Sequence, residues 1–261
     1  MSKIGKRGLY ALSHWTVEDT MPIKINLALP VYGAAYKSVF VRSLFAALTH
    51  KSLSSYAFTL SEIEYTDIPF SRNYLLTNFY YKKPDCSHIL MIDSDMGFSP
   101  DLIAAMLALD KPVVGTLYPR RLIDLRKLHS LSTLPFDKAL AQSLEFIGTI
   151  VEPRQETGGF VRVTSCGTGI FLVSRDCVTT IIEKLPETVD RSRYRKNKYT
   201  AQFENFLTPF AKIVTPELDL ACDFSFCHRW AEQCGGEIWA SFDRKIAHAG
   251  DLTVSAAYSD L

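Results

Sequence analysis

The sequence has no apolar run that approaches the roughly 20 residues of a membrane-spanning helix. Near its start, Lys3, Lys6 and Arg7 are not followed by the apolar stretch that a secretory signal needs. We therefore expect no transmembrane segment and no secretion signal. An excess of charge of one sign is also missing. The net charge is +1, which argues against a protein that coats nucleic acid along its whole surface.

No CxxC pair occurs among the six cysteines, and their spacing fits no common zinc site. Scattered single cysteines are typical of a reduced intracellular protein, because disulfides persist mainly in oxidising compartments. We expect a cytoplasmic protein, with a peripheral position at a membrane left open. The six are Cys86, Cys166, Cys177, Cys222, Cys227 and Cys234.

What the sequence does contain is enough apolar material for a substantial core. Of its 261 residues, 47% are hydrophobic and 22% are charged. This length suits one large domain or two closely joined lobes. We divide the chain into an N-terminal extension (1–23), a first half (24–117), a second half (118–250) and a C-terminal tail (251–261).

Short apolar runs alternate with helical patterns through the first half. This alternation predicts an α/β fold with a mostly parallel central sheet and helices on both faces. Pro30 is expected to end the first strand, and later runs predict a smaller antiparallel section in the second half. The predicted strands are Lys24–Leu29, Phe58–Tyr65, Ser87–Ile92, Pro112–Leu117, Phe146–Val151, Gly159–Val163 and Ile170–Val173, and the predicted helices include Val39–His50, one opened by Ser71, and Pro100–Leu109.

The apolar run Ser87–Ile92 ends abruptly in Asp93-Ser94-Asp95. The helix predicted after it has its own cap in Ser99, so the two acids are not needed to start that helix. In open α/β sheets, ligands bind at the carboxyl ends of the strands. Two carboxylates one residue apart can bind one hard cation and leave its other positions for water and phosphate oxygens. The alternative is a solvated acidic turn.

Three arginines could supply positive charge near this edge. Arg72 lies near the start of a predicted helix, where the helix N-terminus already favours anions. Arg120 and Arg121 follow a predicted buried strand and could bind a diphosphate through paired N–H groups. The alternative for all three is a surface arginine that is solvated or paired with a carboxylate.

The stretch Asp190–Tyr199 is the most strongly charged part of the chain. A solvated loop is the simplest interpretation, and a lid, an acidic acceptor contact or a nucleic-acid contact are left open. Its basic residues are Arg191, Arg193, Arg195, Lys196 and Lys198.

Two residues near the C-terminal end are candidate functional residues, although the local sequence around each is only a weak indication of function. Asp223 lies just before or within the first turn of a predicted amphipathic helix, where the helix dipole alone favours an acid. His248 lies in a short apolar segment, and a lone histidine is more often structural than a metal ligand.

Six segments, taken in order, resemble the nucleotide-sugar glycosyltransferases of the GT-A fold, specifically family 2-like members with a DxD motif. They span about residues 24–250. The resemblance implies a GT-A (Rossmann-like) fold, with a nucleotide-sugar-binding half (24–117) and an acceptor-side half (118–250). The segments are ALPVYG (Ala28–Gly33), SRN (Ser71–Asn73), DSD (Asp93–Asp95), GTGIFLVSR (Gly167–Arg175), CDFSFCHRW (Cys222–Trp230) and KIAHAG (Lys245–Gly250).

The resemblance also implies a metal site made of Asp93, Asp95 and His248. In the family such residues bind Mn²⁺ or Mg²⁺ and, through the metal, the diphosphate of the donor, which here would be a UDP- or GDP-sugar. Asp95 is the more direct ligand, and Ser94 belongs to the same donor-binding turn.

The resemblance implies that Asp223 is the catalytic base of an inverting enzyme. The match is incomplete, because Cys222 stands where the family usually has a first acid. The other donor-binding positions that the resemblance implies are Pro30, Tyr32, Arg72, Arg120 and Arg121.

The leading hypothesis is a metal-dependent hexosyltransferase that moves a sugar from a nucleoside-diphosphate sugar to a carbohydrate or another hydroxyl-bearing acceptor. The metal and arginines suit a departing diphosphate, and one carboxylate suits an acceptor hydroxyl that loses a proton. Four alternatives are kept. They are a retaining enzyme with the same metal site, a transferase acting on a modified nucleic-acid base, a nucleotidyltransferase, and a non-enzymatic metal-binding module.

Overall fold

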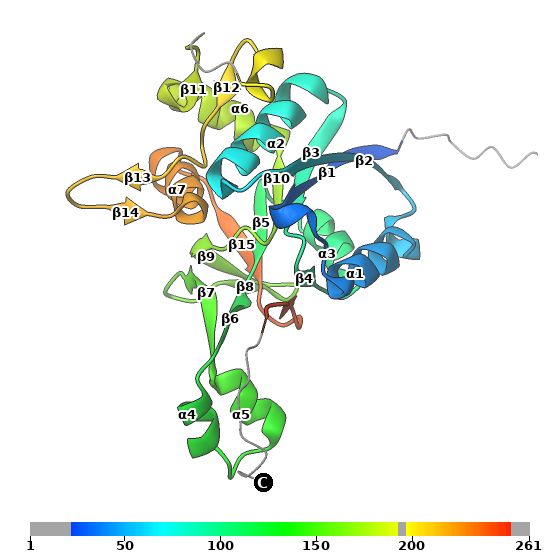
Figure 1. Cartoon of the computed structure of the whole chain (residues 1–261), viewed down its shortest axis with the longest axis vertical. Coiled ribbons are helices and arrows are strands. Elements are labelled where there is room, and N and C mark those ends of the chain that lie inside the picture. Colours follow the sequence, from blue (N-terminus) through cyan, green and yellow to red (C-terminus); the bar gives the residue numbers. More distant parts are fainter. Residues whose placement is uncertain (1–21, 193–196, 252–261) are drawn as a thin grey trace, which may run out of the picture.

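The computed structural model describes residues 22–192 and 197–251 (Figure 1). Residues 1–21 of the predicted N-terminal extension, residues 193–196 of the basic stretch and residues 252–261 of the tail lie outside the described residues. Three of the basic residues considered for a nucleic-acid contact, Arg193, Arg195 and Lys196, are among them.

The strands follow one another in an order that alternates with helices over the first half of the chain. They are β1 (Ile23–Val31), β2 (Tyr56–Glu64), β3 (Cys86–Ile92), β4 (Met96–Gly97), β5 (Val113–Thr116), β6 (Tyr118–Ile123), β7 (Leu144–Ile150), β8 (Glu156–Thr157), β9 (Phe160–Cys166), β10 (Ile170–Ser174), β11 (Val189–Asp190), β12 (Phe206–Leu207), β13 (Ile213–Val214), β14 (Asp219–Leu220), β15 (Ile238–Ser241) and β16 (Ala247–His248).

The α-helices are short, except for two that flank the first strands. They are α1 (Ser38–Leu48), α2 (Ile68–Lys82), α3 (Leu102–Ala108), α4 (Leu125–Ser130), α5 (Phe136–Gln142), α6 (Arg175–Lys184) and α7 (Cys222–His228). Single helical turns occur at η1 (Tyr32–Ala34), η2 (Lys51–Leu53), η3 (Pro186–Thr188), η4 (Thr200–Gln202) and the π-helical η5 (Arg229–Gln233).

One large sheet organises the molecule, with its strands in the order β2-β1-β3-β10-β5-β15-β9-β7-β6. Strands β2, β1, β3, β5 and β15 run in the same direction, and β10 runs against its neighbours β3 and β5. Beyond β15, each of the strands β9, β7 and β6 runs antiparallel to the strand before it in the sheet. The predicted α/β class, with a mostly parallel centre flanked by helices and a smaller antiparallel section, is confirmed.

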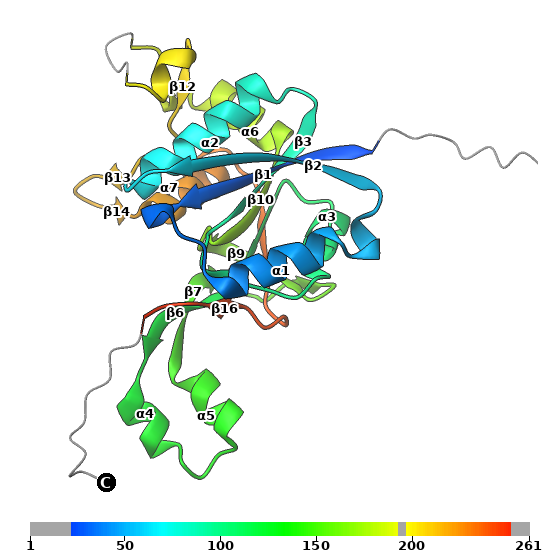
Figure 2. The ribbon, with the colours of Figure 1, turned by 45° about the vertical axis from the view of Figure 1, so that its right-hand side comes forward.

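Both faces of the sheet are covered, as alternate side chains of β3 illustrate. Ile89 and Met91 pack on the face covered by α2, α6 and α7, whereas Leu90 and Ile92 pack on the face covered by α1 and α3 (Figure 2). All four side chains are fully buried. This is why β3 reads as a continuous apolar run: a strand buried on both faces has no polar side.

Among the predicted boundaries that differ from the structure, two concern residues considered for donor binding. The first strand does not stop at Pro30 but runs on to Val31, and Pro30 pairs with Ile63 of β2. The pairing of β1 with β3 has already ended at Ala28, so a proline at this point lies in a stretch with only one neighbouring strand. The helix predicted to open at Ser71 begins earlier, at Ile68.

A projection extends from the body of the molecule. Strands β6 and β7 form an antiparallel ribbon that carries α4 and α5 at its outer end (Figures 1 and 2). We call this projection, residues 118–150, the arm. Both of its helices are shorter than two full turns, too short to show a helical period in sequence.

Candidate functional site

The turn after β3 is fixed by three backbone hydrogen bonds at the carboxyl edge of the sheet. Asp93 N–H donates to the carbonyl of Gly169 at 2.8 Å, and Met96 N–H donates to the carbonyl of Asp93 at 3.2 Å. Lys37 N–H, just before α1, donates to the carbonyl of Ser94 at 2.9 Å. The two acids of the turn are therefore held by the backbone, and their side chains are left to other partners.

A two-residue pairing brings His248 to Asp95. Strand β16 pairs with β4 so that His248 lies opposite Met96, and Ala249 N–H donates to the carbonyl of Asp95 at 2.9 Å. As a result, His248 Nε2 lies 3.6 Å from Asp95 Oδ2. On the other side of the ring, Nδ1 lies 2.9 Å from the carbonyl of Pro119.

These contacts assign the two ring nitrogens of His248. A carbonyl oxygen can only accept, so Nδ1 carries the proton and donates to Pro119. When the imidazole is neutral, Nε2 therefore presents its lone pair toward Asp95, which is the arrangement of a metal-ligating histidine. Burial would lower the pKa of His248, but the hydrogen bonds to Asp95 and to Pro119 outweigh it, and the pKa is raised.

Arg121 also contacts the Asp95 carboxylate. Its Nη1 lies 3.0 Å from Oδ2, the same oxygen that faces His248. Burial would raise the pKa of Asp95, but the His248 hydrogen bond and the charges of His248 and Arg121 outweigh it and lower that pKa. The Arg121 side chain is 54% exposed, so it is free to turn toward another anion. Arg120 instead lies 3.3 Å from Glu145 on the arm, away from this cluster.

Arg72 is the buried link between two acids. The helix α2 begins after Asp67, whose carboxylate caps it by accepting from Phe70 N–H, so Arg72 lies inside the helix and not at its N-terminus. Its side chain is only 3% exposed. Nη2 lies 3.1 Å from Asp93 Oδ2, and Nε lies 3.6 Å from Asp223 Oδ1.

The remaining donor of Arg72 also faces the protein, because Nη1 donates to the carbonyl of Thr168 at 3.2 Å. Every guanidinium nitrogen of Arg72 therefore points at a carboxylate or a carbonyl of the chain. Arg72 was predicted to contact a diphosphate. In the structure its guanidinium is buried against Asp93, Asp223 and Thr168, where it orients the two carboxylates.

Asp223 lies in the first turn of α7, as predicted, and faces Thr168. Its Oδ2 accepts from Thr168 N–H at 3.2 Å, and its Oδ1 accepts from the Cys222 thiol at 3.1 Å. Burial would raise the pKa of Asp223, but the charge of Arg72 and the hydrogen bonds from Cys222 and Thr168 outweigh it and lower that pKa. The carboxylate is 22% exposed, so an ionised acid is reachable from outside.

Cys222, at the position where the resemblance expects a first acid, acts here as a donor to Asp223. Burial, the neighbouring Asp223 charge and this hydrogen bond together raise the pKa of its thiol to about 12, in spite of the Arg72 charge. The thiol is therefore neutral and cannot replace a carboxylate as a base.

The three predicted metal ligands are not brought together as a set. Asp93 turns to Arg72, whereas Asp95 and His248 face each other. Within residues 22–192 and 197–251, no group of three His, Cys, Asp or Glu side chains is arranged to hold a metal ion. Burial raises the pKa of Asp93, an effect that Arg72 only partly offsets. Asp95 and His248 thus have donor atoms close enough to share one ion.

Tyr118 is a site residue that the sequence analysis did not identify. It is buried, its hydroxyl accepts from Gly169 N–H at 3.1 Å, and its ring meets that of His248 edge-on at 5.3 Å. Gly167 and Gly169 allow Tyr118 to approach the backbone closely, since a Cβ at Gly167 would overlap its hydroxyl and one at Gly169 would lie 2.9 Å from its ring.

The last predicted donor-binding residues lie at the same edge of the sheet. Pro30 is buried near the end of β1. Tyr32, in η1 directly after β1, is 62% exposed. Ser94 lies between the two acids and is partly exposed.

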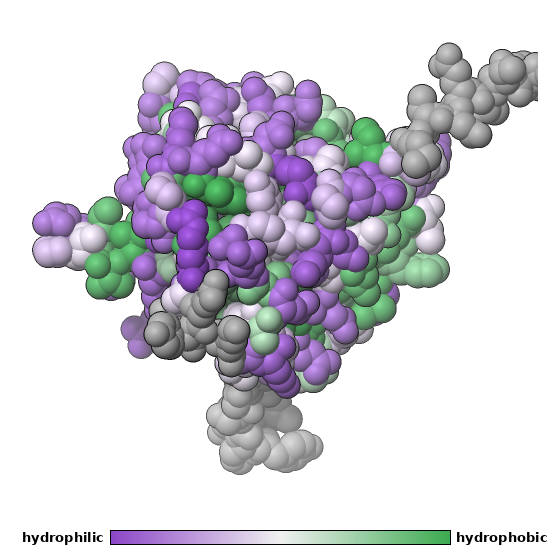
Figure 3. All heavy atoms as spheres, turned by 90° about the horizontal axis from the view of Figure 1, so that it is seen from above, coloured by the Kyte–Doolittle hydropathy of each residue, from purple (hydrophilic) through white to green (hydrophobic). Residues whose placement is uncertain are grey.

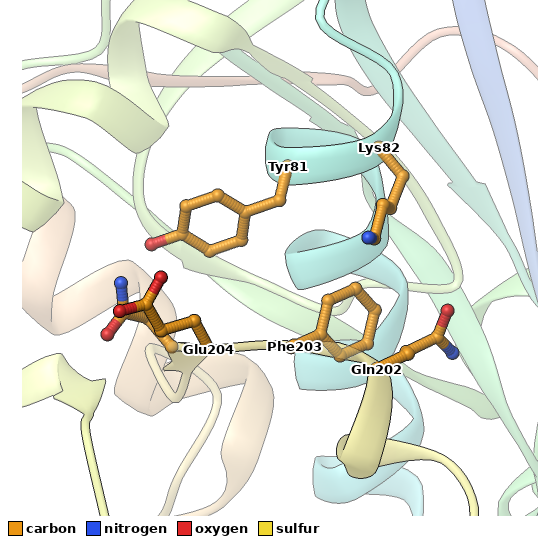
Figure 4. Close-up of a pocket in the computed structure, with 6 residues that line it drawn as sticks. Tyr81, Lys82, Gln202, Phe203 and Glu204 are labelled. Atoms are coloured by element: carbon orange, nitrogen blue, oxygen red, sulfur yellow. The ribbon is translucent and has the colours of Figure 1, made fainter.

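A separate cleft of about 250 Å³ lies at the far end of α2 (Figure 4). Tyr81 and Lys82 line it from the helix and face Phe203 across it, with Lys82 Nζ 5.8 Å from the centre of the Phe203 ring. Tyr81 is nine residues beyond Arg72, about 14 Å along the helix at the usual rise. The cleft is therefore not part of the Asp95 and Arg72 cluster.

No protein-family model and no curated protein matches the sequence. Solved structures share its fold in part. A197 from STIV is 12% identical, with a TM-score of 0.47 over 88% of this chain and 87% of that one. GalNAc-T7 with UDP, GalNAc and Mn²⁺ is 10% identical, with a TM-score of 0.46 over 87% of this chain but 43% of that one.

UDP-glucose pyrophosphorylase complexed with UDP-glucose is 7% identical, with a TM-score of 0.41 over 87% of this chain and 92% of that one. At these identities and scores the likeness concerns chain arrangement only. The case for a function therefore rests on the site.

Proposed function

We propose that this protein is a metal-dependent glycosyltransferase of the GT-A type, which moves a sugar from a nucleoside-diphosphate sugar to an acceptor hydroxyl. One observation carries the proposal. Asp95 and His248, more than 150 residues apart in sequence, lie side by side at the carboxyl edge of the sheet, beside a buried Arg72 that joins Asp93 to Asp223.

The donor atoms of Asp95 and His248 fit one divalent cation. One oxygen and one nitrogen 3.6 Å apart can bind the same ion and leave its other positions for diphosphate oxygens and water. The imidazole nitrogen favours Mn²⁺ over Mg²⁺, which prefers oxygen ligands. When bound, the ion would neutralise the charge that develops on the departing diphosphate.

The chain's own residues supply the remaining steps. Arg121, half-exposed and next to Asp95, is placed to hold the diphosphate and stabilise its developing charge. Asp223, ionised because its pKa is lowered, accepts the proton of the acceptor hydroxyl as general base. Thr168 N–H and Arg72 orient the Asp223 carboxylate. A single displacement, with Asp223 deprotonating the attacking hydroxyl, would invert the configuration at the anomeric carbon.

The direct test is an assay of nucleoside diphosphate release from a panel of UDP- and GDP-sugars in the presence of Mn²⁺. We expect release from at least one sugar nucleotide, loss on chelation with EDTA and recovery when Mn²⁺ is restored. Release from none of the panel, with or without candidate acceptors, would contradict the proposal. Formation of a sugar nucleotide from a sugar phosphate and a nucleoside triphosphate would identify a nucleotidyltransferase instead.

Arg121 should compete with the metal for Asp95, because its guanidinium contacts the oxygen that faces His248. Replacing Arg121 with alanine should tighten Mn²⁺ binding about fivefold without a nucleotide, since a half-exposed ion pair is worth up to about 1 kcal/mol. The same variant should bind the sugar nucleotide more weakly, because the diphosphate loses a cation. Electron paramagnetic resonance of free Mn²⁺ measures the first effect and KM the second.

The neighbouring Arg120 provides the matched control, because it pairs with Glu145 and not with Asp95. Arg120→Ala should leave Mn²⁺ affinity unchanged. Unchanged or weaker Mn²⁺ binding in Arg121→Ala would show that the metal does not use Asp95.

A further inference from the structure

The arm exposes several large apolar side chains. Five of them are between 45% and 67% exposed. They occur on both strands and at the first position of both helices, so exposure is not confined to one loop. They are Leu122, Ile123, Leu125, Phe136 and Phe146.

Some of these residues share one face of the arm's ribbon. Ile123 pairs directly with Leu144, and Phe146 lies two residues further along β7, so pleating puts the three side chains on the same side. On the arm's two helices the buried apolar side chain is Ala139 of α5, which is 3% exposed, whereas Leu125 and Phe136 are 66% and 67% exposed. These apolar side chains are therefore available to a partner.

Basic side chains accompany the apolar ones. The arm carries five Lys and Arg residues against three Asp and Glu residues. Arg126, Lys127 and Lys138 are exposed and have no ion pair within the described part of the chain, whereas Asp124 caps α4 by accepting from Lys127 N–H. The opposite end of the molecule, over β11, β12 and α6, is mainly hydrophilic (Figure 3).

We propose that the arm docks on an anionic lipid bilayer, inserting apolar side chains such as Leu125 and Phe136 at the headgroup boundary while Arg126, Lys127 and Lys138 contact lipid phosphates. Exposed apolar residues flanked by Lys and Arg are the composition of an interfacial membrane contact. The cores of protein–protein interfaces are depleted of lysine, so a second copy or another protein fits this surface less well.

Docking would set the candidate site close to the bilayer. The base of the arm carries Arg121, which contacts Asp95, and Pro119, whose carbonyl accepts from His248. Membrane attachment rests on the arm alone. Only its consequence, that the transferase acts on an acceptor presented at a lipid surface, rests on the proposed function.

The test is co-sedimentation of the full chain with vesicles of phosphatidylcholine alone and of phosphatidylcholine mixed with phosphatidylglycerol. We expect binding to the anionic vesicles that weakens with added salt, and weaker binding to the neutral ones. The double variant Leu125→Glu/Phe136→Glu should lower the binding constant at least about tenfold, because two inserted side chains become charged. Both positions are exposed, so the thermal midpoint should not change.

Val214 provides the matched control, since it is 70% exposed but lies on β13, away from the arm. Val214→Glu should bind vesicles as the unaltered chain does. Absence of vesicle binding, or equal loss of binding in Val214→Glu, would overturn the proposal. So would a dimer in solution that the double variant dissociates, because the arm would then be an interface between two copies. None of these readouts depends on sugar transfer.

Discussion

Replacing Arg72 with methionine should lower the free energy of unfolding by about 3 kcal/mol, the low end for a buried ion pair that loses one partner. The guanidinium is 3% exposed and lies between Asp93 and Asp223, so its removal leaves two largely buried carboxylates without their cation. Methionine keeps much of the side-chain volume and limits the contribution of a cavity. Urea unfolding of the unaltered protein and of Arg72→Met measures the difference in the free energy of unfolding.

Two further variants show whether charge is the cause. Adding Asp93→Asn to Arg72→Met should recover part of the lost stability, because one uncompensated charge is then removed. Arg120→Met removes an arginine whose partner is Glu145 on the surface, and it should cost less than about 1 kcal/mol. A loss below about 1 kcal/mol for Arg72→Met would show that the buried arginine does not hold the two acids together.

The second large effect is expected at Asp223. Asp223→Asn should lower kcat for sugar transfer by about 10²–10⁴, the range for loss of a general base. Asparagine can still accept from Thr168 N–H through its side-chain oxygen, so the fold at the start of α7 should be kept. Steady-state kinetics, with NMR of the anomeric configuration of the product, measures both rate and stereochemistry.

Asp219→Asn is the control for this substitution, because Asp219 is an exposed aspartate on β14, close in sequence to Asp223. It should leave kcat unchanged. A kcat in Asp223→Asn within threefold of the unaltered chain, or a product that retains the donor's configuration, would remove Asp223 from the role of base.

The sequence predicts well those elements that are buried on both faces. Strand β3 was predicted at Ser87–Ile92 and observed at Cys86–Ile92, and β10 was predicted at Ile170–Val173 and observed at Ile170–Ser174. A continuous apolar run can only be satisfied inside a sheet covered by helices, so the pattern and the fold agree. The position of Asp93 and Asp95 at the end of β3 follows from the same run.

What the sequence could not predict are contacts that local patterns do not encode. Strands β4 and β16 are two residues each and have no period, yet they bring His248 to Asp95. The partners of Arg72 lie 21 residues away at Asp93 and 96 residues away at Thr168. The local pattern of α2 therefore suggests that Arg72 contacts an anion, but it does not identify Asp93 and Thr168 as the partners.

The start of α2 was misplaced for a local reason. Ser71 looks like a cap, but Asp67 caps the helix, and Pro69 follows within its first turn. Ser71 is instead fully buried within the helix, where its hydroxyl donates to the carbonyl of Asp67. The spacing of Asp67 and Pro69 is a sequence signal for a helix that begins after Asp67. That start would have placed Arg72 within the body of the helix.

The most direct test of the central claim is a crystal structure of the chain with Mn²⁺ and UDP or GDP, with the anomalous signal of manganese recorded. We expect one peak bound by a carboxylate oxygen of Asp95, by Nε2 of His248 and by diphosphate oxygens, with Arg121 turned away from Asp95. A peak elsewhere, or a nucleotide bound far from the carboxyl end of β3, would contradict the account.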